Sequence, residues 1–347
     1  MSAILVLGRV LIVAFAAWCL TTITTGDALA AGTAYRGVNL AGAEFNAGRL
    51  PGTVHKDYTY PKTSDVDYFA GRGMNVFRLP FRWERLQPAL QGEFDAAELS
   101  RIDAFVAHAT DQGHFVVIDP HNYARYRGEV IGKEIEAAAF ADLWARLATH
   151  YRDNQKVIFG LMNEPNGMPT ELWRNDANAA IRAIRAAGAN NLVLVPGNAW
   201  STAGTWFQDW YGTPNATAML EIEDPGNNFA FEVHQYLDGN SSGTSETCVD
   251  ATVGSRRLEG FTKWLRMHGK RGFLGEFAGG RNDTCHAALE DMLAHVEANA
   301  EVWLGWTYWA GGPWWGEYIF TLQPTGCPTA CVDRPQMAAL RPYLDPP

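Results

Sequence analysis

The stretch that decides the fold runs from Val157 to Pro165 and reads VIFGLMNEP. Its first six residues are apolar or glycine, without polar alternation, which is typical of a parallel strand buried on both faces. Asn163, Glu164 and Pro165 follow at once. Polar residues directly after a buried parallel strand are typical of the active sites of α/β barrels.

Similar apolar or alternating runs recur along the chain, and together they predict eight strands. The eight runs are Tyr35–Leu40, Met74–Leu79, His114–Asp119, Val157–Met162, Asn191–Pro196, Phe229–Gln235, Arg271–Glu276 and Val302–Tyr308. Several intervening segments have apolar residues at helical spacing. These predicted helices are Ala96–Thr110, Glu134–Tyr151, Glu171–Ala187 and Ala287–Asn299.

Strands that alternate with helices favour parallel βαβ units, and eight such units favour a single closed (β/α)8 TIM barrel of the α/β class. A doubly wound open sheet is the alternative. The glycine-rich phosphate fingerprint that such a sheet often carries after its first strand is absent here.

Length and charge limit the domain organisation and the partners. The chain has 347 residues, which suits one barrel of about 250 residues with insertions. No long Ser/Thr/Pro linker follows residue 30, so we expect one catalytic domain over residues 31–347. We also expect a monomer. The net charge of −10 disfavours nucleic acid and anionic membrane partners and suits a neutral substrate.

The N-terminal 30 residues resemble a secretion signal. Arg9 precedes an uncharged run over residues 10–25, and Ala28-Leu29-Ala30 forms an A-x-A cleavage pattern. We therefore expect cleavage near Ala30 and a secreted, extracellular or periplasmic protein without membrane contact. An uncleaved membrane anchor is the alternative, although the run of 16 residues is short for a membrane-spanning helix.

Four cysteines remain after Cys19 leaves with the signal. An even number in an exported chain suggests two disulfides, for which three pairings exist. We predict the pairs Cys248–Cys285 and Cys327–Cys331. The spacing of a zinc ribbon is absent, and no cofactor or thiolate-bound metal is expected.

Two acids stand out because each directly follows an apolar strand. They are Glu164 after the fourth strand and Glu276 at the end of the seventh. Glycoside hydrolysis uses two carboxyl groups that flank the scissile bond. Strands four and seven lie across the mouth of an eight-stranded barrel, so these two carboxylates are predicted to face each other.

Further polar and aromatic residues gather at the ends of the predicted strands. These candidates are Asn39, Arg78, His121, Asn122, Asn163, Trp200, His234, Tyr236 and Trp309. Arg78 could keep a nucleophile ionised, because a nearby cation lowers the pKa of a carboxyl group. His121 and His234 could instead bind zinc, but neither an HxH nor an HExxH spacing supports this alternative.

Thirteen tryptophans are more than a core alone requires, and flat rings suit the apolar faces of sugars. The aromatic candidates for sugar binding are Tyr123, Trp200, Trp206, Trp210, Trp314 and Trp315. Trp200 is the first choice because it follows the fifth strand directly. Asn122 and Asn198 are candidates for bonding sugar hydroxyls.

At these residues the chain resembles glycoside hydrolase family 5, the cellulase family of retaining (β/α)8 enzymes. The most specific motifs are Phe159–Pro165 and Leu274–Phe277, and the likeness covers essentially the whole chain after the signal. Residues 37–45 and 119–123 resemble fungal-type and related bacterial endoglucanases in particular. The resemblance implies cleavage of internal β-1,4 bonds in glucan without a metal.

The resemblance also implies a role for each candidate. Glu164 matches the acid/base and Glu276 the nucleophile, while Asn163 matches the residue that bonds the sugar 2-hydroxyl. The supporting residues of the family match Arg78, His121, His234, Tyr236 and Trp309.

Three alternatives remain open. The chain could hydrolyse another β-glycan, such as mannan, xyloglucan or mixed-linkage β-glucan, because the fold and the catalytic pair would be the same. It could be a non-catalytic carbohydrate-binding barrel, although both glutamates are present. It could also be a metal-dependent hydrolase.

Overall fold

The computed structural model describes Met1 and residues 32–344. The predicted secretion signal, with Cys19, lies outside the described residues, apart from Met1. No helix in the described part of the chain combines the length and apolarity that a membrane span requires.

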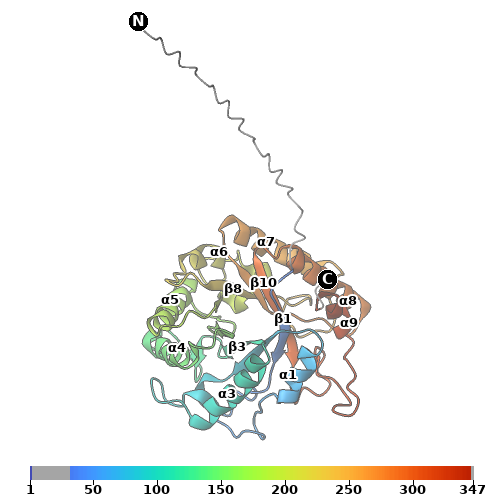
Figure 1. The fold of residues 1–347 in the computed structure, drawn as a ribbon, viewed down its shortest axis with the longest axis horizontal. Helices are drawn as coiled ribbons and strands as arrows, with labels where there is room; N and C mark the ends of the chain where they lie inside the picture. The colour runs from blue at the N-terminus through green and yellow to red at the C-terminus, as the bar shows by residue number, and fades with distance from the viewer. Residues whose placement is uncertain (2–31, 345–347) are drawn as a thin grey trace. The chain divides into compact units, whose positions relative to one another are not determined.

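Eight parallel strands form a closed barrel, which confirms the predicted fold class (Figure 1). Their order around the barrel is β1, β10, β9, β8, β7, β6, β3 and β2. The bounds are β1 Tyr35–Leu40, β2 Val76–Phe81, β3 Phe115–Pro120, β6 Val157–Gly160, β7 Val193–Pro196, β8 Phe229–His234, β9 Gly272–Glu276 and β10 Trp303–Gly311. The antiparallel pair of β4 (Arg125–Tyr126) and β5 (Glu129–Val130) follows β3.

Helices surround the barrel (Figure 1). Their bounds are α1 Thr63–Ala70, α2 Trp83–Leu86, α3 Ala96–Asp111, α4 Ala137–Tyr151, α5 Thr170–Ala186, α6 Asn215–Ala218, α7 Val253–Met267, α8 Asp283–Ala298 and α9 Met337–Leu340. Helix α8 begins four residues earlier than predicted, because Asn282 caps it by accepting a 3.0 Å hydrogen bond from the Cys285 amide.

The interior of the barrel changes from apolar to charged along the strands. Its apolar layer consists of Val76, Val117, Ile158, Leu192, Leu194, Ala230 and Phe273. Side chains on one face of a strand repeat every second residue. The next inward residues on five of these strands are therefore Arg78, Asp119, Gly160, Glu232 and Gly275.

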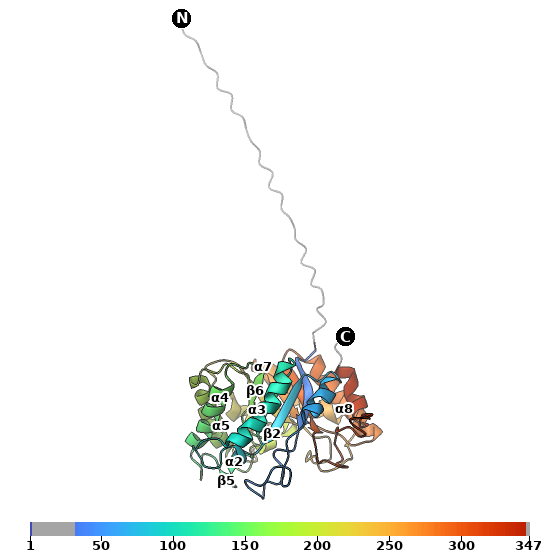
Figure 2. The ribbon, with the colours of Figure 1, turned by 60° about the horizontal axis from the view of Figure 1, so that its bottom comes forward.

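This charged layer lies toward the carboxyl end of the strands. In Figure 2, α2 and β5, which follow β2 and β3 in the chain, lie at the lower end of the barrel. Both predicted disulfides are present as pairs, with Cα–Cα distances of 5.2 Å for Cys248–Cys285 and 4.4 Å for Cys327–Cys331. The first pair joins the loop after β8 to the first turn of α8.

Candidate active site

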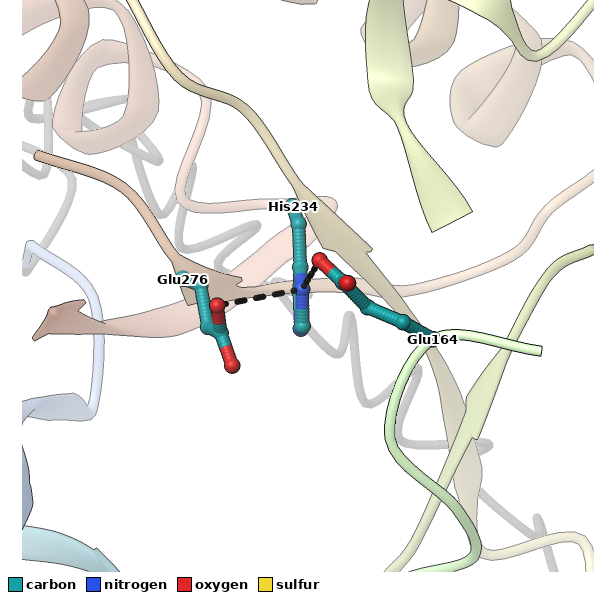
Figure 3. Close-up of side chains that lie close together, drawn as sticks. All are labelled: Glu164, His234 and Glu276. Carbon is teal, nitrogen blue, oxygen red and sulfur yellow. Dashed lines mark hydrogen bonds and ion pairs between the residues drawn. The ribbon is translucent and has the colours of Figure 1, made fainter. Parts of the chain in front are cut away.

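The two predicted glutamates meet at the carboxyl end of the barrel. Glu164 follows β6 and Glu276 ends β9, while His234 ends β8 and lies between them (Figure 3). One oxygen of each carboxylate and one ring nitrogen of His234 lie within 4.8 Å of one another. Two carboxyl groups this close can act on one bond from two sides.

The backbone at Glu164 is strained and held in place. Its φ of 42° lies in the left-handed region, which residues other than glycine rarely adopt. The amide of Asn163 donates a 3.0 Å hydrogen bond to the Pro120 carbonyl, and the amide of Trp200 donates one of 3.0 Å to the Pro165 carbonyl. These two bonds fix the direction of the Glu164 side chain from both sides.

Arg78 on β2 is fully buried and connects several of the predicted residues. Its Nη1 donates to Oε1 of Glu276 at 3.0 Å and to Oδ1 of Asn39 at 2.9 Å. Its Nη2 donates to Oδ1 of Asn163 at 2.9 Å. Asn39 in turn donates to the Gly275 carbonyl at 2.9 Å. Asn39 therefore orients the guanidinium and the backbone that precedes Glu276.

His234 and Tyr236 contact the two carboxylates directly. Nδ1 of His234 lies 2.8 Å from Oε1 of Glu164 and 3.5 Å from Oε2 of Glu276. The hydroxyl of Tyr236 donates to Oε2 of Glu276 at 2.8 Å. Burial raises the pKa of the Glu276 carboxyl, while the charges of His234 and Arg78 oppose this rise.

His121 and Trp309 form an aromatic wall across the ends of β3 and β10. Their rings stack at 5.5 Å, and Nδ1 of His121 lies 2.8 Å from Oδ2 of Asp119. Burial lowers the pKa of His121 to about 3, so its ring is neutral. Within residues 32–344, no cluster of three metal-binding donors includes both His121 and His234.

A cavity of about 470 Å³ opens beside Glu164. Tyr123, Trp200, Trp210 and Tyr236 line it. Trp200 is 41% exposed and Trp210 is 56% exposed, so both rings can take part in binding. The cavity offers aromatic surface to sugar rings on the Glu164 side of the site.

Trp200 reaches this cavity through an unusual turn. Ala199, Trp200 and Ser201 all have left-handed backbones, with φ of 55°, 58° and 51°. Such a conformation costs about 1–2 kcal/mol for each residue that is not glycine. Ser201 stabilises the turn, since its Oγ accepts from the Gly197 amide at 2.8 Å and donates to the Glu232 carbonyl at 2.5 Å.

The expectation that Trp206 binds sugar is wrong. Its side chain is fully buried, and its ring packs against Phe231, Phe261 and Trp264 at 4.8–5.9 Å between centroids. The chain turns inward at η2 (Ala203–Thr205), so Trp206 belongs to the core between the barrel and α7.

Asn122 and Asn198 do not face the cavity either, and each is 1% exposed. Oδ1 of Asn122 accepts from the Trp83 amide at 2.9 Å, and its Nδ2 donates to Glu84 at 2.7 Å. Nδ2 of Asn198 donates to the Met168 carbonyl at 2.6 Å. Both side chains hold loops together, which corrects their assignment to sugar hydroxyls.

The two tryptophans after β10 differ in their surroundings. Trp315 packs against Trp309 at 6.0 Å and against Tyr318 at 4.5 Å, and its Nε1 donates to the Gly311 carbonyl. Trp315 therefore holds the Trp309 ring in place by packing against it. Trp314 is 52% exposed and does not line the cavity beside Glu164.

Sequence reasoning missed two acids in the charged layer, Asp119 and Glu232. Both are 1% exposed. Oδ2 of Asp119 lies 3.1 Å from Nη2 of Arg78, and Oε1 of Glu232 lies 3.1 Å from Nε of Arg78. Burial raises the pKa of Asp119 to about 7. Each acid follows an inward apolar residue, Val117 or Ala230, by two positions, so strand periodicity could have found both.

A (β/α)8 barrel with two facing carboxylates at its strand ends defines the class of barrel glycoside hydrolases. The chain belongs to glycosyl hydrolase family 5, because residues 36–312 match the family model described as Cellulase (glycosyl hydrolase family 5).

Among curated relatives, the endo-beta-1,4-glucanase B of Aspergillus niger is 43% identical over 289 residues, which cover 83% of this chain and 84% of the relative. Endoglucanase 3 of Humicola insolens is 44% identical over 290 residues, 83% of this chain and 72% of the relative.

Solved structures agree in fold. An endo-beta-1,4-glucanase of Xanthomonas axonopodis pv. citri with a triple mutation is 52% identical, with a TM-score of 0.87 over 89% of this chain and 98% of that chain. The structure of XacCel5A in complex with cellopentaose is also 52% identical, with a TM-score of 0.87 over 90% of this chain and 99% of that one.

Proposed function

We propose that this chain is a secreted endo-β-1,4-glucanase that retains the anomeric configuration, with Glu276 as nucleophile and Glu164 as acid/base. The approach of the two carboxylate oxygens to within 4.8 Å carries this proposal. In retaining glycosidases the two carboxyl groups are about 5–5.5 Å apart, whereas inverting enzymes leave room for a water at about 6.5–9.5 Å.

In the first step, an oxygen of Glu276 bonds to the anomeric carbon while the bond from that carbon to the leaving sugar oxygen breaks. Glu164 gives its proton to the leaving oxygen. Arg78 and Tyr236 hold the Glu276 carboxylate by hydrogen bonds of 3.0 and 2.8 Å, so the attacking oxygen is oriented.

In the second step, Glu164 takes a proton from water, and the hydroxyl bonds to the anomeric carbon as the ester to Glu276 breaks. The negative charge of Glu276 is absent in the ester. This loss of a neighbouring charge suits the change of Glu164 from acid to base.

The substrate proposal rests on the relatives. Their names specify β-1,4-glucan, and one solved relative holds cellopentaose. The cavity beside Glu164 suits the leaving part of the chain, since Trp200 and Trp210 offer ring faces there. Rates on carboxymethylcellulose, lichenan and galactomannan test this proposal. A much faster reaction on galactomannan would exclude glucan as the preferred substrate.

Azide tests the assignment of the nucleophile. In Glu276→Ala, a small anion can enter from the face that the carboxylate occupied. We expect loss of activity and recovery with azide, giving a glycosyl azide of inverted configuration. Glu164→Ala is the matched control. Azide should restore its activity as well, but the glycosyl azide should then have the retained configuration. Full activity of Glu276→Ala without azide would exclude its role.

We also propose that residues 1–30 are removed on export, that residues 31–347 form the catalytic domain, and that the domain works as a monomer. The intact mass of the exported protein tests the cleavage site, and sedimentation tests the monomer. The proposed reaction needs no metal or cofactor, so activity is expected to survive excess EDTA.

A further inference from the structure

Glu232 places a third carboxylate beneath the catalytic pair. It faces the barrel interior from β8, two residues before His234, and is 1% exposed. Its Oε1 lies 3.1 Å from Nε of Arg78 and 3.4 Å from Nε2 of His234. The contact with Arg78 is an ion pair without hydrogen-bond alignment. Glu232 therefore touches the two cations that hold Glu276.

The two ring nitrogens of His234 both face carboxylates. Nδ1 faces Glu164 at 2.8 Å and Glu276 at 3.5 Å, and Nε2 faces Glu232 at 3.4 Å. A neutral imidazole has one N–H and one lone pair, so either tautomer would direct a lone pair at a carboxylate. With all three carboxylates ionised, only the doubly protonated ring matches both sides.

The surrounding charges agree with this geometry. Burial lowers the pKa of His234, but Glu276, Glu164 and Glu232 outweigh burial and raise it to about 10. Asp119 adds a further negative group from β3, and Arg78 is the opposing cation from β2. The remaining ring in this layer, His121, is neutral.

We propose that Glu232 is a positioning residue that keeps His234 doubly protonated, so that its Nδ1–H is directed at Glu164 and Glu276. This inference rests on the proposed function of those two glutamates. A cation between the carboxylates reduces their repulsion and favours an ionised nucleophile. Glu232 acts through His234 and Arg78, because it is 1% exposed and is not among the residues that line the cavity beside Glu164.

Glu232 also packs against Gly275, the residue before the nucleophile. A Cβ at Gly275 would lie 2.1 Å from Oε1 of Glu232, so the carboxylate rests on the residue that precedes Glu276. The Gly275 carbonyl accepts from Asn39 at 2.9 Å and from Thr307 at 2.6 Å. The same side chain therefore sets the charge of His234 and limits the movement of Glu276.

The titration of His234 by 15N NMR tests the proposal without relying on activity. We expect both ring nitrogens of His234 to be protonated in the wild type at pH 8. The signals of this ring are those that disappear in His234→Asn. Glu232→Gln keeps the volume of the side chain and loses its charge. In this variant the midpoint of the His234 titration is expected to fall by at least about one pH unit. A fall in kcat with little change in KM is expected on cellopentaose.

Glu98→Gln is the matched control. Glu98 is also a buried glutamate, but it bonds Tyr58 and Tyr60 outside the barrel interior, and its removal should leave the midpoint unchanged. A neutral His234 in the wild type at pH 8, or an unchanged midpoint in Glu232→Gln, would overturn the proposal. If Glu232→Gln does not fold, the titration of His234 in the wild type and in Glu232→Asp, which keeps the charge, still tests the proposal.

This outcome is separate from the proposed function. Wild-type protein that hydrolyses no β-glycan would refute the enzyme proposal, whatever the charge of His234. Active wild type with a neutral His234 would refute only the role of Glu232.

Discussion

The hydroxyl of Tyr236 donates a 2.8 Å hydrogen bond to Oε2 of Glu276. Arg78 binds the other oxygen, Oε1, at 3.0 Å. Each oxygen of the proposed nucleophile thus has its own donor, one from the loop after β8 and the other from β2. The carboxylate is held in one orientation before any sugar binds.

Tyr236→Phe removes one of these donors and keeps the ring. Because a hydrogen bond to a charged group contributes about 1.5–3 kcal/mol, kcat should fall about 10- to 150-fold. Steady-state rates on cellopentaose measure the change. Tyr151→Phe is the control, since that phenol also donates to a carboxylate, Asp103, but lies on α4. Equal losses in the two variants would contradict the special position of Tyr236.

Gly275→Ala tests the packing under the nucleophile. The new Cβ would lie 2.1 Å from Oε1 of Glu232, which is buried and cannot move into solvent. We expect a loss of about 100-fold or more in kcat, the size of effect that a misplaced catalytic group produces. Gly48→Ala, whose Cβ would have nothing within 4 Å, should keep full activity. A fully active Gly275→Ala would rule out this contact.

Trp200 and Trp206 lie six residues apart and should respond in opposite ways. Trp200→Ala should lower kcat/KM on cellopentaose about 10-fold, through loss of about 1.4 kcal/mol of sugar contact, with little effect on stability. Trp206→Ala should lose about 3–5 kcal/mol of unfolding free energy, because it empties a core position. Urea unfolding and kinetics on both variants distinguish the roles. Stability losses of equal size would contradict them.

Asp176 on α5 gives a pH-dependent stability effect away from the site. It is fully buried, and neither carboxylate oxygen has a hydrogen-bond partner among residues 32–344. Burial raises its pKa to about 7. In the unfolded chain an aspartate titrates near about 3.9.

Between these two values the folded state holds a proton that the unfolded state has lost. Wild-type stability should therefore fall as the pH rises from about 4 to about 7. Asp176→Asn cannot ionise, so its advantage over the wild type should grow over that range and reach about 1–3 kcal/mol. Urea unfolding at both pH values measures it, with the exposed Asp111→Asn as control. A difference between variant and wild type that does not depend on pH would contradict the assignment.

The barrel and the facing pair of glutamates were predictable for local reasons. Glu276 directly follows an apolar run, and only Asn163 separates Glu164 from one, so their position at a strand end could be read without knowing the fold in detail. Glu232 escaped because it lies inside a strand that otherwise looks apolar, whereas Asp119 ends a predicted strand but was not singled out there. Applying the two-residue period to every predicted strand would have brought both into the site.

The errors concern features that depend on tertiary structure. Trp200 and Trp206 occupy the same loop, and two turns separate the exposed ring from the buried one: the left-handed turn over residues 199–201 and the turn at η2. Nothing in Ala-Trp-Ser predicts such a turn. Asn122 follows a strand like the two glutamates, but its amide meets Trp83 and Glu84 from the neighbouring α2, a contact between segments almost 40 residues apart.

The stereochemistry of the first product tests the central claim most directly. 1H NMR during early hydrolysis of cellopentaose distinguishes the anomer of the new reducing end before mutarotation mixes the two forms. Double displacement through Glu276 and Glu164 predicts that the β-anomer forms first and the α-anomer appears later. Initial formation of the α-anomer would mean inversion, and would contradict the assignment of Glu276 as a nucleophile.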